Sequence, residues 1–399
     1  MDEEMEKLAI NGGHPVRSTM LNYARQLIDD DDIDAVVDIL KGDWLTTGPT
    51  ISAFESAVAD YTGAKYAVAV NTGTAALHGA VHAAGIKQGD EVIVPPLTFV
   101  ASSNCVLYAG AKPVFADIDA KTLNIDPKDI ENKITTRTKA IVAVDLCGQP
   151  CDHDEIRKIA EKNHLTVIED ASHSLGGTYY GRKVGTLQEM TTLSFHPVKL
   201  ITTGEGGMVL LDDEGKAEKI RSFRHHGIDL DYHKRKQANL WQYDIVDLGY
   251  NYRITDFCCA LGISQLKKLD GWLARRRFIA KQYDKAFADL TEIETPYIDT
   301  RCVSAWHIYV IKLKLNRLNV GREVIYKALH AENIGVNVHY IPIPWLGLYQ
   351  KLGYSKGSCP VAEQEYERLL TLPLYPAMCR QDVQDVIDGI HKVINFYKK

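Results

Sequence analysis

Short runs of consecutive apolar residues alternate along the first half of the chain with segments whose apolar residues recur every three or four positions. The second pattern is typical of helices with one buried side, and it predicts helices over residues 32–41 and 50–61. The first pattern predicts strands. The predicted strands cover residues 66–70, 91–95, 113–118, 140–146, 166–170, 191–195 and 207–212.

These strands are continuously apolar rather than apolar at every second residue. A strand with that pattern is buried on both faces, and strands of this kind that alternate with helices form mostly parallel sheets. The pattern therefore predicts an α/β fold. Because ligands bind beyond the carboxyl ends of the strands in such sheets, the residues that follow each run are the candidates for a functional site.

The last third of the chain shows a different arrangement. A long helix is predicted from Thr255 onward, and it leads into a second region with its own strands and helices. That region has predicted strands at 307–313 and 335–341 and predicted helices at 322–331 and 382–397. We therefore predict a large domain over residues 1–262 and a smaller C-terminal domain over residues 263–399.

Composition narrows the class of protein. The 399 residues are 45% hydrophobic and 25% charged, and the formal net charge of −6 is made of interspersed signs without a basic stripe. A nucleic-acid partner is therefore not expected. No apolar run is long enough to cross a bilayer and no signal peptide is present, so no membrane partner is expected. The eight scattered cysteines are interpreted as reduced thiols without a metal site, which favours the cytoplasm.

The turn after the first predicted strand is a candidate anion site. Residues Asn71-Thr72-Gly73-Thr74 open a helix, and hydroxyl groups and a glycine stand beside its free backbone N–H groups. Such a helix start suits a phosphate. An ordinary capping turn explains the same residues equally well.

Two residues near the end of the strand at 166–170 are candidates for polar contacts. Asp170 ends a buried strand, where an unpaired carboxylate is costly, so it requires a cationic or hydrogen-bonding partner. A protonated pyridine nitrogen meets that requirement, and so does a structural arginine. His173 either donates a hydrogen bond to a ring substituent or serves as a buried supporting histidine.

Three further residues are expected at the same edge of the sheet. Phe99 is placed either to lie against a flat ring or to fill the core. Ser194 closes a strand and has a hydroxyl group to offer to a phosphate. Lys199 follows shortly after, close to the glycine-rich stretch "GEGG", and is compatible with a solvated charge in a turn or with a nucleophile in a pocket.

Together these residues match the requirements of pyridoxal 5′-phosphate (PLP). That cofactor needs a phosphate site, a lysine that forms a Schiff base, a carboxylate that keeps the ring nitrogen protonated and an aromatic side chain against the ring. Each signal is weak alone, but the order of the residues and their shared position at strand ends favour this combination. A nicotinamide cofactor is disfavoured because no G-x-G-x-x-G sequence follows the first strand.

Several longer stretches resemble the DegT/DnrJ/StrS group of sugar aminotransferases. This resemblance implies PLP-dependent transferase fold type I, the aspartate-aminotransferase type, with a mixed, mostly parallel seven-stranded sheet in the large domain and a smaller C-terminal α/β domain. It extends from residue 11 to residue 378. The stretches are "NGGHPVRS", "WLTTGPTISAFE", "NTGTAALH", "PPLTFVAS", "IEDASHSLGG", "SFHPVKLITTGEGGMV", "LGYNYRITDFCCALGISQLKKLD" and "LPLYPAM".

The resemblance assigns roles to the candidate residues. It implies that Lys199 forms the Schiff base, that Asp170 contacts the pyridine nitrogen and that Phe99 covers one face of the ring. Where many members carry glutamine this chain has His173, which can donate to the phenolic oxygen but titrates near neutral pH. The phosphate is expected to bind Gly73, Thr74 and Ser194.

The resemblance also implies a homodimer with shared active sites. In the group, the asparagine at the position of Asn251 reaches the phosphate of the neighbouring subunit's cofactor. Arg253 is expected to face the same shared site and a substrate phosphate. His339 and Tyr340 of the C-terminal region are expected on the substrate side.

The stretches "SFHPVK", "RHHGI", "EDASHSLGG" and "VHYIPIP" are most similar to enzymes that aminate C4 of a UDP-linked keto sugar. The implied substrates are L-glutamate and a UDP-linked 2-acetamido-2,6-dideoxy-hexos-4-ulose, with the L-arabino isomer favoured. The implied product, UDP-4-amino-4,6-dideoxy-N-acetyl-β-L-altrosamine, belongs to pseudaminic acid biosynthesis. Alternatives are another UDP- or dTDP-linked keto sugar aminated at C3 or C4, and a regulatory or binding homologue without turnover.

Overall fold

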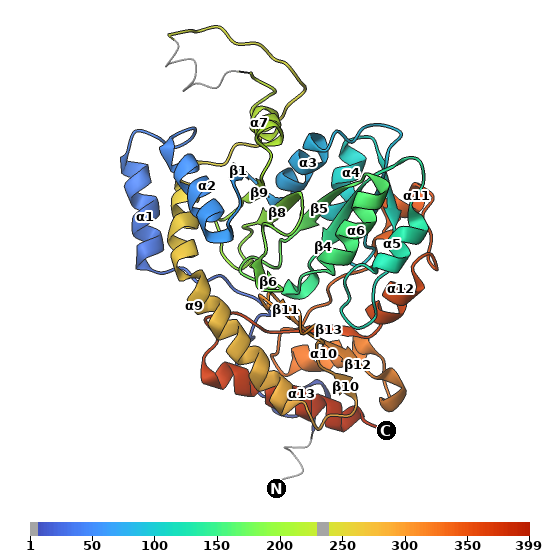
Figure 1. The fold of residues 1–399 in the computed structure, drawn as a ribbon. Coiled ribbons are helices and arrows are strands. Elements are labelled where there is room, and N and C mark those ends of the chain that lie inside the picture. Colours follow the sequence, from blue (N-terminus) through green and yellow to red (C-terminus); the bar gives the residue numbers. More distant parts are fainter. Residues whose placement is uncertain (1–6, 230–238) are drawn as a thin grey trace.

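A seven-stranded sheet forms the centre of the computed structural model, which describes residues 7–229 and 239–399 (Figure 1). All seven strands predicted for the first half of the chain are present, with ends that differ from the prediction by at most three residues. They are β1 (Tyr66–Val70), β2 (Glu91–Val94), β3 (Lys112–Phe115), β4 (Thr138–Val144), β5 (Thr166–Asp170), β8 (Met190–Ser194) and β9 (Gly207–Leu211).

The sheet is mixed but mostly parallel, as the family resemblance implied. Its strand order is β1-β9-β8-β5-β4-β2-β3, and β9 alone runs antiparallel to its two neighbours. The pairs β8–β5, β5–β4, β4–β2 and β2–β3 are parallel. The carboxyl ends of six strands therefore lie along one edge of the sheet, where the candidate residues at strand ends come together.

The helices cover the sheet and build the C-terminal region (Figure 1). The predicted helices at 32–41, 50–61, 322–331 and 382–397 are all present. The helices are α1 (Asp30–Lys41), α2 (Pro49–Thr62), α3 (Gly73–Ala83), α4 (Ala101–Tyr108), α5 (Pro127–Lys133), α6 (His153–Asn163), α7 (Glu214–Phe223), α9 (Asp256–Ala286), α10 (Arg322–Ala331), α11 (Gly347–Lys351), α12 (Pro360–Tyr366) and α13 (Arg380–Tyr397).

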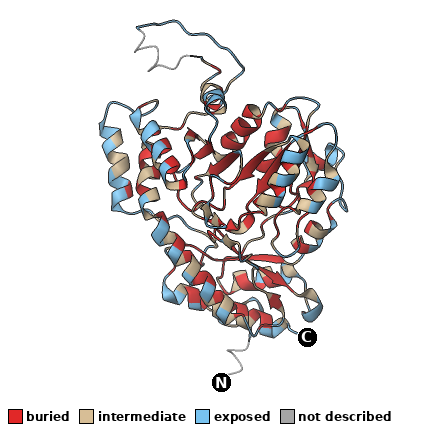
Figure 2. Ribbon diagram, in the orientation of Figure 1, coloured by how far each residue is buried: buried red, intermediate tan, exposed pale blue. Residues whose placement is uncertain are grey.

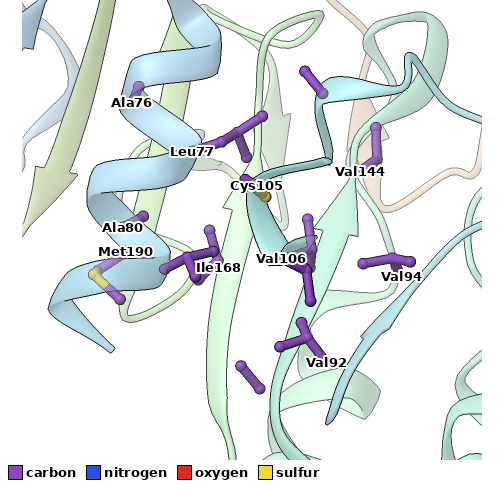
Figure 3. Packing of buried hydrophobic residues seen from close by; sticks show 14 of the residues in the cluster. Ala76, Leu77, Ala80, Val92, Val94, Cys105, Val106, Val144, Ile168 and Met190 are labelled. Atoms are coloured by element: carbon purple, nitrogen blue, oxygen red, sulfur yellow. The ribbon is translucent and has the colours of Figure 1, made fainter. Parts of the chain in front are cut away.

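Alternate residues of each strand enter the cores on opposite faces of the sheet. In β2, Val92 and Val94 belong to the cluster under α3, α4 and α7, whereas Ile93 belongs to the cluster under α5 and α6. Figure 3 shows the first cluster, with Leu77 and Val106 among the side chains between the helices and the strands. Burial of the sheet on both faces explains why its strands lack polar alternation (Figure 2).

The long helix α9 begins after its N-cap Thr255, as predicted, and joins the two parts of the chain. Its residues Leu269 and Leu273 pack with α2, whereas Ile279 and Tyr283 belong to the hydrophobic cluster of the C-terminal region. The boundary proposed between residues 262 and 263 falls inside this helix and stays a prediction. No helix in the described part of the chain is both long and apolar enough to span a membrane.

The C-terminal strands differ from the prediction. The run at 307–313 forms β12 (Tyr309–Leu313), which lies between β10 (Ile293–Glu294) and β13 (Leu369–Leu372). The prediction of a strand at 335–341 was wrong. That segment makes a single bridge, from Asn337 to Thr371, because its four residues 337–340 line a cavity instead of pairing along a sheet edge.

A third, small sheet joins the two parts of the chain beside α9. Its strands are β6 (Thr178–Tyr179), β7 (Arg182–Lys183) and β11 (Cys302–Val303), in the order β11-β6-β7. β11 precedes β12, so the pairing ties the C-terminal region to the loop that follows His173.

A glycine in α9 allows this helix to approach α2, and its replacement tests the packing. A Cβ atom at Gly262 would lie 2.6 Å from two ring carbons of Phe54 and 2.8 Å from Cγ2 of Thr203. We expect Gly262→Ala to lower the free energy of unfolding by about 1–3 kcal/mol. In the same helix, a Cβ at Gly271 would meet nothing within 4 Å.

Gly271→Ala is therefore the matched control, and it should raise the free energy of unfolding by about 0.5–1 kcal/mol. Urea unfolding followed by circular dichroism measures both variants. Equal changes in the two variants would contradict the packing argument.

Candidate active site

The strand ends and the C-terminal region enclose a cavity of about 650 Å³. Lys199 and Asp170 both line it, together with most of the residues that the sequence singled out. These further predicted residues in the cavity lining are Gly73, Thr74, Phe99, His173, Ser194, His339 and Tyr340. Residues more than 260 positions apart in the chain thus meet in one site at the carboxyl edge of the sheet.

The start of α3, where an anion site is predicted, lines the cavity. The side chain of Thr72 accepts a hydrogen bond from the backbone N–H of Ala75 at 3.0 Å and so caps the helix. The N–H groups of Gly73 and Thr74 belong to the first turn, whose amides have no partner within a helix. A Cβ at Gly73 would lie 2.8 Å from Cβ of Ser194, so only glycine lets the serine approach this helix start.

Asp170 is a buried carboxylate held by neutral donors. Ser102 donates to Oδ2 at 2.7 Å, and Ser172 donates to Oδ1 through its hydroxyl group at 2.6 Å and its N–H group at 3.2 Å. In the described part of the chain no arginine contacts Asp170, so the alternative of a structural arginine partner is not supported. The carboxylate can therefore accept one further donor, such as a ring N–H.

Lys199 lies in the turn after β8, where its backbone N–H donates to the carbonyl of His196 at 2.9 Å. Burial lowers the pKa of the Lys199 amine to about 8, and the negative charge of Asp170 opposes that shift. A lysine with such a pKa is about one-tenth free amine at pH 7, far more than an ordinary lysine, and a nucleophile and proton carrier requires the free amine. Its place in the cavity lining does not support the alternative of a solvated turn charge.

Three histidines surround the lysine and are uncharged at neutral pH. The rings of His173 and His307 lie 4.2 Å apart between centroids, and Nδ1 of His339 lies 2.8 Å from Oγ1 of Thr371. Burial lowers the pKa of all three side chains, and the charge of Lys199 adds to the effect. The expectation that His173 titrates near neutral pH was therefore wrong.

The aromatic side chains occupy the open part of the cavity. Phe99 is 56% exposed, and its ring centroid lies 6.1 Å from that of Tyr340. The hydroxyl group of Tyr340 lies 3.4 Å from Nε2 of His173. Both rings are therefore placed where they can contact a flat ligand between the sheet edge and the C-terminal region.

Asn251 and Arg253 do not line this cavity in their own chain. Asn251 is exposed, and its backbone carbonyl accepts from the side chain of Asn71 at 3.4 Å. Arg253 lies 2.9 Å from Nδ1 of His225. The loop at 228–247 leads into this segment, and its residues 230–238 lie outside the described part of the chain.

Several cavity residues were missed in the sequence. Ser102 and Ser172 are the donors to Asp170, and both stand in the quoted stretches "PPLTFVAS" and "IEDASHSLGG", which was the available signal. His307, Tyr23 and Asn337 are brought in by the folding of distant segments, and no local pattern marked them.

The match to known protein families agrees with this geometry. Residues 26–391 match the model of the DegT/DnrJ/EryC1/StrS aminotransferase family. The chain belongs to this family. Two curated relatives cover 95% of this chain: the uncharacterised protein MJ1066 of Methanocaldococcus jannaschii, 44% identical over 99% of its length, and the spore coat polysaccharide biosynthesis protein SpsC of Bacillus subtilis, 42% identical over 98%.

Solved structures of sugar aminotransferases share the whole fold. The putative sugar aminotransferase Spr1654 of Streptococcus pneumoniae, in its PMP form, has a TM-score of 0.90 and 32% identity, covering 94% of this chain and 99% of its own. PseC of Helicobacter pylori, an aminotransferase of pseudaminic acid biosynthesis, has a TM-score of 0.88 and 32% identity, covering 94% and 100%. Spr1654 is also known in a PLP form.

The protein is thus a PLP-dependent sugar aminotransferase, and its cavity suits the cofactor. The narrow helix start at Gly73 offers N–H groups to a phosphate, and Asp170 has acceptor capacity for a ring N–H. Nδ1 of His173 is buried without a hydrogen-bond partner in the described part of the chain, which leaves a polar atom for a ligand to satisfy. Lys199 brings an amine to the same cavity.

The lowered pKa of Lys199 predicts how cofactor attachment depends on pH. Only the free amine reacts with an aldehyde, so the rate of PLP attachment to the apoprotein should rise with pH and be half-maximal near pH 8. Asp170→Asn removes the charge that opposes the shift, so its midpoint should lie at lower pH. Stopped-flow absorbance measures both rates, and a wild-type midpoint near the ordinary lysine pKa of 10.5 would contradict the burial argument.

Proposed function

We propose that this enzyme transfers the amino group of L-glutamate to the 4-keto group of a UDP-linked 2-acetamido-2,6-dideoxy-hexos-4-ulose of L-arabino configuration. The product would be UDP-4-amino-4,6-dideoxy-N-acetyl-β-L-altrosamine. The observation that carries the proposal is the likeness to PseC over that enzyme's whole length, together with an intact Lys199 and Asp170. The stretches "SFHPVK" and "VHYIPIP" support the same assignment.

The residues of the cavity have distinct tasks in this reaction. When bound, PLP supplies an aldehyde that bonds amines and a ring that accepts the electrons of a broken C–H bond. Asp170 keeps a proton on the ring nitrogen, and Gly73, Thr74 and Ser194 bind the phosphate. Phe99 lies against the ring. Lys199 removes a proton from Cα of the donor and later returns a proton at C4 of the sugar, so one base acts in both halves.

The substrate side of the cavity is formed by the segment around His339 and Tyr340. Both side chains line the cavity opposite the strand ends, and Tyr340 touches His173. This position supports their assignment to sugar binding. His173, neutral because its pKa is lowered by burial, then has a ring N–H to donate to the phenolic oxygen of PLP.

We also propose a homodimer in which Asn251 and Arg253 complete the partner's site. Both residues lie outside the cavity of their own chain, and the segment before them exposes large apolar side chains. Val246 is 63% exposed and Leu248 is 77% exposed. Apolar side chains gathered in this way are typical of surfaces that another chain covers.

The free cysteines, such as Cys105, agree with the predicted cytoplasmic location.

A different nucleotide-linked keto sugar is the alternative with an observation in its favour. SpsC, whose name refers to spore coat polysaccharide, is 42% identical to this chain, compared with 32% for PseC. A change of sugar would keep Lys199 and Asp170 in their tasks and alter the contacts of His339 and Tyr340. A non-catalytic homologue is disfavoured because the lysine, the carboxylate and the phosphate cradle are all present.

A substrate panel tests the sugar. Purified enzyme with PLP and L-glutamate is mixed with freshly made UDP-linked 4-keto-6-deoxy-N-acetylhexosamines of both C5 configurations and with dTDP-linked 3- and 4-keto sugars, and products are followed by mass spectrometry. We expect amination of the L-arabino isomer and none with Lys199→Ala. Amination of another sugar alone would replace the substrate, and turnover by Lys199→Ala would refute the role of the lysine.

Complementation between two inactive variants tests the shared site. Lys199→Ala and Asn251→Ala are each expected to lower turnover strongly. In a mixed dimer, one site combines an intact Lys199 with the partner's intact Asn251, so co-expressed subunits should show turnover well above that of either variant alone. Co-expression without any recovery would show that Asn251 does not act across the dimer.

A further inference from the structure

A cluster of three ionisable side chains is buried behind the cavity. Asp145 follows β4, His153 begins α6, and Glu169 precedes Asp170 in β5; all three are 0% exposed. Nε2 of His153 lies 3.0 Å from Oδ1 of Asp145 and 3.4 Å from Oε1 of Glu169. Because successive residues of a strand point to opposite faces, Glu169 faces α6 while Asp170 faces the cavity.

Of the four oxygens of the two carboxylates, Oε1 of Glu169 alone lacks a hydrogen bond in the described part of the chain. Asp145 accepts from the backbone N–H of Cys151 at 2.9 Å and from the hydroxyl group of Ser174 at 2.7 Å. Oε2 of Glu169 accepts from Thr191 at 2.6 Å. Oε1 of Glu169 has no hydrogen-bond partner in the described part of the chain. Two adjacent buried carboxylates with one unmatched oxygen are costly unless a proton or a cation is added.

The hydrogen bonds of the His153 ring indicate whether this cluster holds an extra proton or a metal ion. The side-chain amide nitrogen of Gln188 lies 2.9 Å from the carbonyl oxygen of His153 and 3.1 Å from its Nδ1. An amide nitrogen only donates, so Nδ1 is an acceptor and the ring proton is on Nε2. That N–H points at the two carboxylates, so Nε2 has no lone pair with which to bind a metal. One N–H donor between two carboxylates does not balance both charges, so the pair needs one further proton.

We propose that Glu169 is a positioning residue: it holds one proton at neutral pH, shared with Asp145, and so keeps the ends of β4 and β5 joined beneath Asp170. This inference rests on the proposed role of Asp170 in cofactor binding. Burial raises the pKa of Glu169 to about 8, and the charge of Asp145 adds to the shift. Burial lowers the pKa of His153, but its two carboxylate neighbours raise it above the ordinary value. The amide donor at Nδ1 favours the neutral ring, and a neutral ring does not oppose the shift of Glu169. The other titratable groups near the cluster are Cys151, Cys302 and Arg157.

The cluster reaches the cofactor side of the sheet through two contacts. The backbone N–H of Asp145 donates to the carbonyl of Asp170 at 3.1 Å. Ser174, which donates to Asp145, directly follows His173. The shared proton therefore holds both ends of the turn that carries Asp170 and His173, and ionisation of Glu169 would place two negative charges side by side and loosen that turn.

Thermal unfolding of the apoprotein against pH tests the proton. An unperturbed glutamate has a pKa of 4.5, so between pH 4.5 and about 8 the wild-type chain takes up a proton on folding and loses stability as the pH rises. In Glu169→Gln an amide donor replaces the proton at every pH. We expect the Tm of this variant relative to wild type to rise by several degrees from pH 5 to pH 8 and to stay constant above.

Glu161→Gln, at an exposed position of α6, is the matched control and should show no such trend. A Tm difference for Glu169→Gln that does not change with pH would overturn the inference. So would a metal bound stoichiometrically to purified wild-type protein and lost in Glu169→Gln, because the cluster would then be a metal site.

PLP affinity tests the positioning role without any sugar substrate. Glu169→Ala breaks the link to Asp145, and we expect its Kd for PLP, measured by absorbance titration, to rise about tenfold, whereas Glu169→Gln should restore near-wild-type affinity. Equal affinities in all three proteins would show that the cluster does not position Asp170. If the substrate panel failed while this pattern held, the choice of sugar would be wrong and the positioning role would stand.

Discussion

A carboxylate at the end of a buried parallel strand is the constraint around which this site is organised. Asp170 cannot lie there unpaired, so the surrounding chain supplies hydroxyl and N–H donors from Ser102 and Ser172. These donors are neutral and leave the negative charge available for a protonated ring. The same charge moderates the effect of burial on the pKa of Lys199, so the two main functional groups depend on each other.

Close backbone approach is the second requirement of the site. The parallel strands bring their carboxyl ends to one edge, but the start of α3 meets Ser194 there only because residue 73 is glycine. On the other side of β5, the cluster of Asp145, His153 and Glu169 holds the same turn from behind. On the side of the sheet, the cavity is therefore lined by residues that hydrogen bonds hold in place.

The seven-stranded sheet was predictable because its signals are local. Continuous apolar runs can only be satisfied by a sheet covered on both faces, and the seven predicted strands appear in the structure. The C-terminal region was less predictable. Residues 335–341 have the β-branched and aromatic composition of a strand, yet Asn337, His339 and Tyr340 turn toward the cavity, and β13 pairs with β12 instead. Tertiary contacts outweighed local preference there.

The sequence by itself determined the α/β class and the order of the strand-end residues, and it singled out Lys199, Asp170 and the start of α3 as candidates, because each depends on neighbours within a few positions. Only the tertiary structure decided that Lys199 lines an enclosed cavity, that His173 is uncharged and that His307 joins the site. Burial and charge proximity arise from segments distant in the chain, and together they lower the pKa of Lys199 and of the three histidines beside it.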